Sequence, residues 1–176
     1  MKIYAVRHPE TVWNRVGRVQ GWRDSPLTAR GKAMVLRLGQ RLTKLDVVEI
    51  RSSDLGRCVT TARIIAKACG ARVLRTTQRL REQNFGALDG KRDDCDAIRT
   101  LTADTCPPGG QSNSAMARRI QAYIRCVAKR PRRHGNILLV THDGPMRAVY
   151  GPIAETDIVQ LAVDARGRVR GRKLKT

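Results

Sequence analysis

The chain has 176 residues, of which 41% are hydrophobic and 3% aromatic, and its formal net charge at pH 7 is +20. This length and composition predict a single domain over residues 1–176, with an aliphatic core. No apolar run reaches the roughly 20 residues of a membrane helix, and no signal-peptide pattern is found, so we expect a cytoplasmic protein without a membrane partner. Five cysteines without a close pair indicate free thiols rather than disulfides or a zinc cluster.

Residues 1–70 alternate short apolar runs with amphipathic segments. Thr28 is a good helix N-cap, and Gly70 is a good helix terminator because glycine readily adopts the left-handed conformation. In chain order, the pattern predicts a strand at 2–6, a polar loop at 9–26 with room for a helical turn, a helix at 29–44, a strand at 47–50, a turn at Ser52-Ser53, and a helix whose apolar stripe runs from Cys58 to Cys69. This is the rhythm of a βαβ fold.

The rest of the chain has an irregular middle followed by further apolar runs. Residues 83–112 are rich in Gly and Pro and carry a weak core signal. In chain order, the pattern predicts a strand at 72–76, this irregular stretch, a helix at 114–129, a basic turn at 130–135, a buried strand at 137–140, a short helix from Asp143-Gly144-Pro145, and a hairpin of 158–163 with 169–174. We therefore expect an α/β three-layer sandwich, with a mostly parallel central sheet and helices on both faces.

Two of the three histidines directly follow predicted strands. One such histidine is more often structural than catalytic, but His8 and His142 are both placed this way. Open α/β sheets bind ligands at the carboxyl ends of their strands. Arg7 precedes His8, and Arg57 falls in the first turn of a helix, where the helix dipole favours anions. These groups predict a site for a dianionic phosphoryl group.

Five motif groups occur in order along the chain. They are RHPETVWN at 7–14 with RVQG at 18–21 and DSPLT at 24–28, SSDLGR at 52–57 with Thr61-Ala62, LRE at 80–82 with Phe85-Gly86 and Gly90, PGG at 108–110, and VTHDG at 140–144. In this order they resemble the histidine phosphatase superfamily, which includes the phosphoglycerate mutases. The resemblance covers most of the chain and implies a phosphoglycerate mutase-like fold.

The resemblance also implies a role for each polar residue at the predicted site. His8 would be the nucleophile that attacks phosphorus, giving a phosphohistidine that water hydrolyses. Arg7, Arg57 and His142 would bind the phosphoryl oxygens in place of metal ions, so no metal and no cofactor is expected. Glu82 would protonate the leaving alkoxide and then activate water. Without the resemblance, Glu82 would be read as a surface carboxylate.

Three more positions match those that the family uses around the phosphate. Asn14, Gln20 and Gly21 would supply side-chain or backbone donors. Each side chain has a structural alternative, since Asn14 could cap a turn and Gln20 could hold the loop.

Two residues depart from the family pattern. Pro9 stands where a glycine usually follows the histidine, and Gln111 stands where a glutamate often follows the glycine pair. The segment after Gly90 is brief, and a mutase needs enclosing segments to retain its substrate. We therefore expect a metal-independent phosphomonoester hydrolase acting on a small phosphorylated metabolite. The alternatives are a phosphoglycerate mutase-type phosphotransferase and a catalytically degenerate basic binding protein.

The positive charge bears on the choice of partner. Cations are denser at 129–134 and 166–175 but occur in nearly every segment. Basic proteins gain affinity for nucleic acid by releasing counterions, so the charge is compatible with such a partner. The scattered distribution of the cations favours ordinary solvent-exposed surfaces over a nucleic-acid site. A phosphorylated small molecule is the expected partner, and the sequence does not indicate an oligomeric state.

Overall fold

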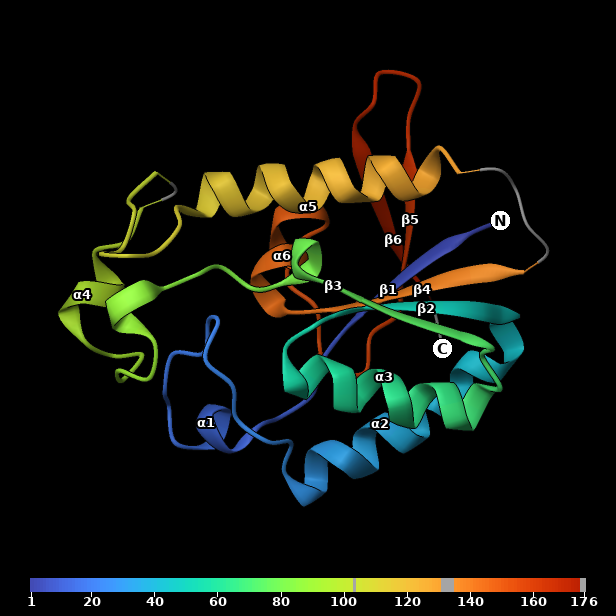
Figure 1. Cartoon of the computed structure of the whole chain (residues 1–176), viewed down its shortest axis with the longest axis horizontal. Helices are drawn as coiled ribbons and strands as arrows, with labels where there is room; N and C mark the ends of the chain where they lie inside the picture. The colour runs from blue at the N-terminus through green and yellow to red at the C-terminus, as the bar shows by residue number, and fades with distance from the viewer. Residues whose placement is uncertain (103, 131–134, 175–176) are drawn as a thin grey trace.

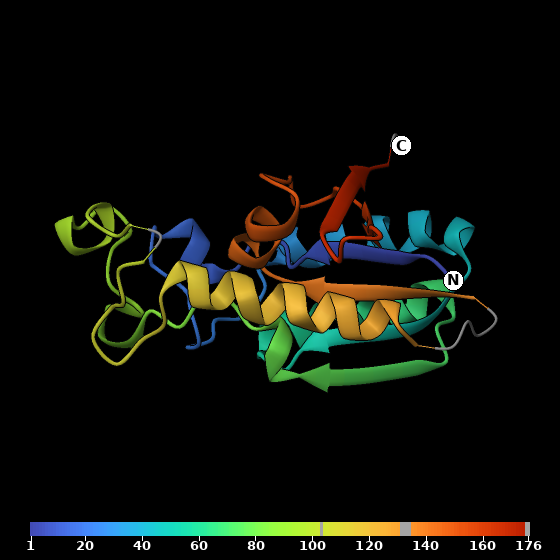
Figure 2. The same cartoon turned by 90° about the horizontal axis from the view of Figure 1, so that it is seen from above.

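The structure is a computed structural model that describes residues 1–102, 104–130 and 135–174. Six strands form one sheet with helices on both faces (Figures 1 and 2). In spatial order the strands are β3 (Val73–Thr77), β2 (Val47–Ser53), β4 (Asn136–Thr141), β1 (Ile3–Arg7), β5 (Val159–Val163) and β6 (Val169–Lys173). The first four are parallel, whereas β5 and β6 are antiparallel to their neighbours. The predicted α/β sandwich with a mostly parallel sheet is confirmed.

Two hydrophobic clusters fill the space between the sheet and its helices. Successive side chains of a strand point to opposite faces, so Tyr4 and Val6 of β1 face one cluster while Ile3 and Ala5 face the other. Helices α2 (Ala29–Leu42) and α3 (Gly56–Cys69) cover the first cluster, and α5 (Asn113–Ala128) and α6 (Asp143–Val149) cover the second. Within the described residues, no helix is long and apolar enough to cross a membrane.

Short helices complete the chain between these elements. They are α1 (Val12–Arg15), α4 (Asp96–Arg99) and the 3-10 turns η1 (Thr43–Leu45), η2 (Gln78–Leu80) and η3 (Gly86–Leu88). The helical turn expected in the 9–26 loop is α1.

The predicted caps are present, but several element boundaries differ from those expected. Thr28 Oγ1 accepts a hydrogen bond from the N–H of Gly31 at 3.0 Å, and Gly70 ends α3 with φ of 70°. Residues 43–44, expected to continue α2, belong to the 3-10 turn η1, and β3 begins and ends one residue later than predicted. The Ser52-Ser53 turn is wrong, because pairing with β3 and β4 continues β2 through these polar residues. The basic turn at 130–135 falls largely on residues 131–134, outside the described residues.

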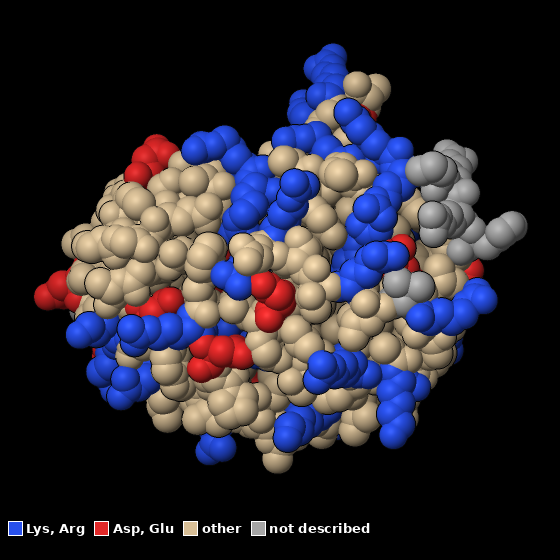
Figure 3. Space-filling model, viewed as in Figure 1, with Lys and Arg blue, Asp and Glu red and all other residues tan. Residues whose placement is uncertain are grey.

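Basic side chains gather where the β5–β6 hairpin rises beside α5 (Figure 3). Arg168, just before β6, and Arg170, within β6, are both exposed. Each forms an ion pair with Asp164, at 3.0 and 3.5 Å respectively. Arg125 of α5 adds a cation near the hairpin turn at Gly167. Part of the hairpin charge is therefore compensated locally.

The parallel strands bring their carboxyl ends to one edge of the sheet. Arg7 lies opposite Thr141 in the β1–β4 pair, and the N–H of His8 donates to the carbonyl of Thr141 at 3.0 Å. Because β4 also pairs with β2, the ends of β1, β4 and β2 are neighbours. This edge holds the predicted site residues His8 and His142.

Candidate active site

The two predicted histidines meet at the carboxyl edge of the sheet. The ring centroids of His8 and His142 lie 5.1 Å apart, with an edge-on angle of 71° between the planes. Both residues are buried. Adjacent parallel strands impose this proximity, since each histidine directly follows its strand.

The ring of His8 is held in one tautomer. Its Nδ1 lies 2.8 Å from the carbonyl oxygen of Pro9, which can only accept, so Nδ1 carries the proton. Nε2 then has the lone pair and accepts a hydrogen bond from Nε of Arg57 at 3.2 Å. Burial, followed by the charge of Arg57, lowers the pKa of His8 to about 3. The ring is therefore neutral near pH 7, with its tautomer set by the carbonyl of Pro9.

His142 is fixed from β2 and α3. Its Nε2 lies 2.9 Å from Oγ of Ser53 and 3.4 Å from Sγ of Cys58. Burial, followed by the charge of Arg57, lowers the pKa of His142 well below its usual value. A neutral imidazole at this position can donate a hydrogen bond without adding positive charge beside His8.

Arg57 lies in the first turn of α3 and is almost wholly buried. Besides its contact with His8, Nη1 forms an ion pair with Asp24 at 3.0 Å, and Nη2 donates to the carbonyl of Gly21 at 2.7 Å. The predicted placement in the first helical turn is confirmed. These contacts orient the guanidinium toward His8.

Arg7 points toward α6. Its Nη1 donates to Oδ1 of Asp143 at 2.8 Å, and the other oxygen of Asp143 accepts from Nε of Arg147 at 2.6 Å. The sequence reading missed Asp143 as a partner, although it follows His142 directly. Asp143 thus connects Arg7 to Arg147.

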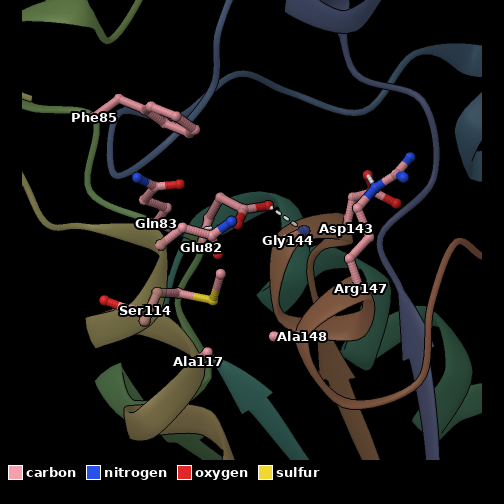
Figure 4. Close-up of a pocket in the computed structure, with 11 residues that line it drawn as sticks. Glu82, Gln83, Phe85, Ser114, Ala117, Asp143, Gly144, Arg147 and Ala148 are labelled. Atoms are coloured by element: carbon pink, nitrogen blue, oxygen red, sulfur yellow. Dashed lines mark hydrogen bonds and ion pairs between the residues drawn. The ribbon is translucent and has the colours of Figure 1, made fainter. Parts of the chain in front are cut away.

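Glu82 is buried, contrary to what its charged neighbours alone suggest. Oε1 accepts from the N–H of Gln83 at 2.9 Å, and Oε2 accepts from the N–H of Gly144 at 3.1 Å (Figure 4). Burial raises the pKa of Glu82, while the two N–H groups and the charge of Arg57 oppose that rise. A raised pKa allows this carboxyl to keep a proton at higher pH, as a general acid must.

A pocket of about 510 Å³ opens beside Glu82. Its described lining comes from the 82–85 segment, the start of α5, and α6 (Figure 4), and consists of Glu82, Gln83, Phe85, Asn113, Ser114, Met116, Ala117, Asp143, Gly144, Arg147 and Ala148. Arg147 is the single cation among them, and it is paired with Asp143. The pocket offers a largely apolar space next to a candidate general acid.

The three remaining predicted residues lie on the 9–26 loop. Asn14 is exposed, and its Oδ1 accepts from the N–H of Thr11 in the capping box of α1. Oε1 of Gln20 accepts from the hydroxyl of Thr11 at 2.8 Å, while its buried Nε2 has no partner among the described residues. The N–H of Gly21 donates to Oδ1 of Asp89 at 2.6 Å. Within the part of the chain that the structure describes, Nε2 of Gln20 is thus left unpaired, whereas Oδ1 of Asn14 and the N–H of Gly21 have structural partners.

Asp89 is a residue that sequence reasoning missed. Its carboxylate accepts hydrogen bonds from the N–H groups of Gly21, Trp22 and Arg23. It therefore holds the loop whose carbonyls contact Arg57. In the sequence, Asp89-Gly90 has only the signature of a turn.

The sheet order, the paired histidines and the buried carboxyl define a phosphoglycerate mutase-like α/β protein. The model of the histidine phosphatase superfamily (branch 1) matches residues 3–163. The chain belongs to this superfamily.

Individual relatives carry different names. A probable phosphoglycerate mutase, GpmB of Salmonella choleraesuis, is 37% identical over 151 residues, which cover 81% of this chain and 69% of that protein. YhfR of Bacillus stearothermophilus has a TM-score of 0.83 and 26% identity, over 96% of this chain and 93% of that one. The mycobacterial glucosyl-3-phosphoglycerate phosphatase Rv2419c has the same TM-score and identity, over 99% and 98%. These names include both mutase and phosphatase.

Proposed function

We propose that the protein is a metal-independent phosphomonoester hydrolase that acts through a phosphohistidine on a small phosphorylated metabolite. The observation that carries this proposal is the state of His8, whose Nδ1–H donates to Pro9 and whose Nε2 keeps a lone pair beside Arg57. A neutral imidazole with a fixed tautomer is the form that can attack phosphorus.

In the first step, Nε2 of His8 forms a bond to phosphorus while the bond to the ester oxygen breaks. Arg57 donates to that same lone pair in this structure, so its guanidinium must transfer this hydrogen bond to a phosphoryl oxygen when substrate binds. Arg7 and His142 supply further donors to the phosphoryl oxygens. Glu82 gives its proton to the departing alkoxide.

In the second step, water attacks the phosphohistidine and the N–P bond breaks. Glu82, now a carboxylate, accepts a proton from the attacking water and returns to its acid form. Burial favours the protonated form of Glu82, which suits both halves of the cycle. Inorganic phosphate then leaves, and His8 regains its lone pair.

The pocket beside Glu82 supports hydrolysis over mutase chemistry. A mutase must hold the charged phosphoglycerate while the phosphoryl group returns. Arg147, the cation among the described lining residues, already pairs with Asp143 at 2.6 Å, and much of the wall is apolar. Such a pocket suits the alcohol part of an ester better than a retained carboxylate.

The test compares wild type, His8→Ala and Glu82→Gln on p-nitrophenyl phosphate and a panel of phosphorylated metabolites, with and without a chelator. We expect chelator-resistant turnover, an acid-labile phosphoenzyme, and loss of both in His8→Ala. Chelator-sensitive turnover that persists in His8→Ala would rule out this mechanism. Isomerisation of phosphoglycerate, rather than its hydrolysis, would establish the mutase alternative.

A second candidate function is nucleic-acid binding by a catalytically degenerate protein. The observation that favours it is the basic surface of the β5–β6 hairpin beside α5 (Figure 3). Salt-dependent nucleic-acid binding that survives His8→Ala, together with an inactive wild type, would support this candidate over the hydrolase.

A further inference from the structure

Arg119 of α5 binds the backbone of the segment that ends at Glu82. Its Nη1 donates to the carbonyls of Arg79 at 3.0 Å and Arg81 at 2.8 Å, with a longer contact to Gln78 at 3.3 Å. Its Nη2 donates to the carbonyl of Glu82 at 2.9 Å. One side chain therefore gathers four carbonyl groups of the irregular turn between β3 and the pocket.

The same guanidinium is held by a neutral side chain. Nη2 of Arg119 also donates to Oε1 of Gln111 at 3.0 Å, and no described carboxylate forms an ion pair with Arg119. Burial lowers the pKa of Arg119, and the charge of Glu82 raises it, so the two side chains interact electrostatically. Arg119 is thus a half-buried cation held by carbonyl and amide oxygens.

The carboxyl of Glu82 is positioned through its backbone. Oε1 accepts from the N–H of Gln83 and Oε2 from the N–H of Gly144 on α6, so the alignment of the carboxyl depends on where the 82–83 backbone lies relative to α6. The carbonyl of Glu82 accepts from Arg119 and also from Nε1 of Trp22, at 3.1 Å. Arg119 therefore bridges the carbonyl of Glu82 and the carbonyls of the preceding turn.

We propose that Arg119 is a positioning residue for the acid–base step, because it holds the turn that aligns the carboxyl of Glu82 with the leaving oxygen. This inference rests on the proposed hydrolase function. Arg119 acts through Glu82 and need not contact the substrate.

A purely structural role and a positioning role make different predictions for two esters. The p-nitrophenolate ion leaves without a proton, whereas the alkoxide of benzyl alcohol needs one. Misplacement of Glu82 should therefore slow hydrolysis of benzyl phosphate more than hydrolysis of p-nitrophenyl phosphate. The two esters have rings of similar size, and their kcat/KM ratio in one preparation does not depend on the fraction of enzyme that is folded.

The experiment measures this ratio in the full-length wild type, Arg119→Met, Arg119→Lys, Glu82→Gln and Arg118→Met. Arg118 is the exposed neighbour on α5 and receives the same substitution as a matched control. We expect the preference for p-nitrophenyl phosphate to rise about tenfold or more in Arg119→Met, in the same direction as in Glu82→Gln. Arg119→Lys should fall between, because one ammonium cannot bridge the carbonyls that a planar guanidinium spans.

Arg118→Met should keep the wild-type ratio. If Arg119→Met also keeps it, whatever happens to overall activity or thermal stability, the positioning role is overturned and Arg119 is structural only. Failure of the wild type to hydrolyse either ester would overturn the proposed function itself, which is a different result from an unchanged ratio.

Discussion

Nε of Arg57 lies 3.2 Å from Nε2 of His8 and donates a hydrogen bond to the nitrogen proposed to attack phosphorus. The remaining guanidinium nitrogens contact Asp24 and the carbonyls of the 20–23 segment. The planar fork thus joins His8 to the loop that surrounds it.

Replacement of Arg57 by Lys should preserve the charge but lose this fork. We expect kcat for p-nitrophenyl phosphate to fall about 10²- to 10³-fold, as when one donor to a transition-state oxygen is removed. Arg63→Lys, on the exposed side of the same helix, is the matched control and should behave as wild type. Wild-type turnover in Arg57→Lys would contradict the proposed role.

Gly144→Ala should displace the carboxyl of Glu82, because a Cβ at residue 144 would clash with Oε1 of Glu82. We expect kcat/KM for alkyl phosphates to fall roughly 10²-fold, at the lower end of general acid–base contributions. The check is a double-mutant cycle with Glu82→Ala. Without the carboxyl, Gly144→Ala should have little further effect, and independent, additive losses would argue against the contact.

His8 makes the stability of the fold depend on pH. Between its usual pKa of 6.5 and the lowered value of about 3, the unfolded chain binds a proton at His8 and the folded chain does not. The free energy of unfolding must therefore fall as pH decreases through this window, by up to about 1.4 kcal/mol per pH unit from this group.

The measurement is denaturant unfolding of wild type and His8→Gln from pH 7 to pH 4. The stability of His8→Gln should fall less steeply as pH decreases, because it lacks this titrating group. Glu82 has the opposite dependence, since its raised pKa gives stability that is lost as pH increases. Subtracting the unfolding free energy of His8→Gln from that of the wild type at each pH removes the contribution of Glu82. Parallel curves for the two proteins would refute the buried neutral state of His8.

Ala117→Leu should fill the pocket beside Glu82. We expect KM for naphthyl phosphate to rise about tenfold, with little change for methyl phosphate, because added methylene groups occupy space that only the larger alcohol needs. Ala122→Leu, at an exposed position on the same helix, is the control. An equal effect on both esters would place the leaving group elsewhere.

The sequence predicted the six strands and helices α1, α2, α3, α5 and α6, but not α4 or the 3-10 turns. It also predicted the site residues whose placement depends on local pattern. His8 and His142 could be placed because each follows an apolar strand, and Arg57 because its helix begins one residue earlier. The contacts of Asp89 and Arg119 could not be predicted, since each acts on a segment about 40 to 70 residues away, with no periodic signal to link them. Likewise, the β2 extension through Ser52-Ser53 depends on strand pairing rather than on propensity.

The position of β4 between β1 and β2 has a consequence for how the chain folds. Ile3 pairs with Ile137, so the strands that carry the two histidines come from segments far apart in sequence. Pairing such distant parallel strands costs loop-closure entropy before their contacts stabilise the sheet, which makes folding slow. During synthesis, β1 and β2 cannot complete their pairing until β4, the strand between them, has been made. We therefore expect the proposed phosphate site to be completed in a late folding step, and a nascent chain that has not reached residue 142 to lack activity.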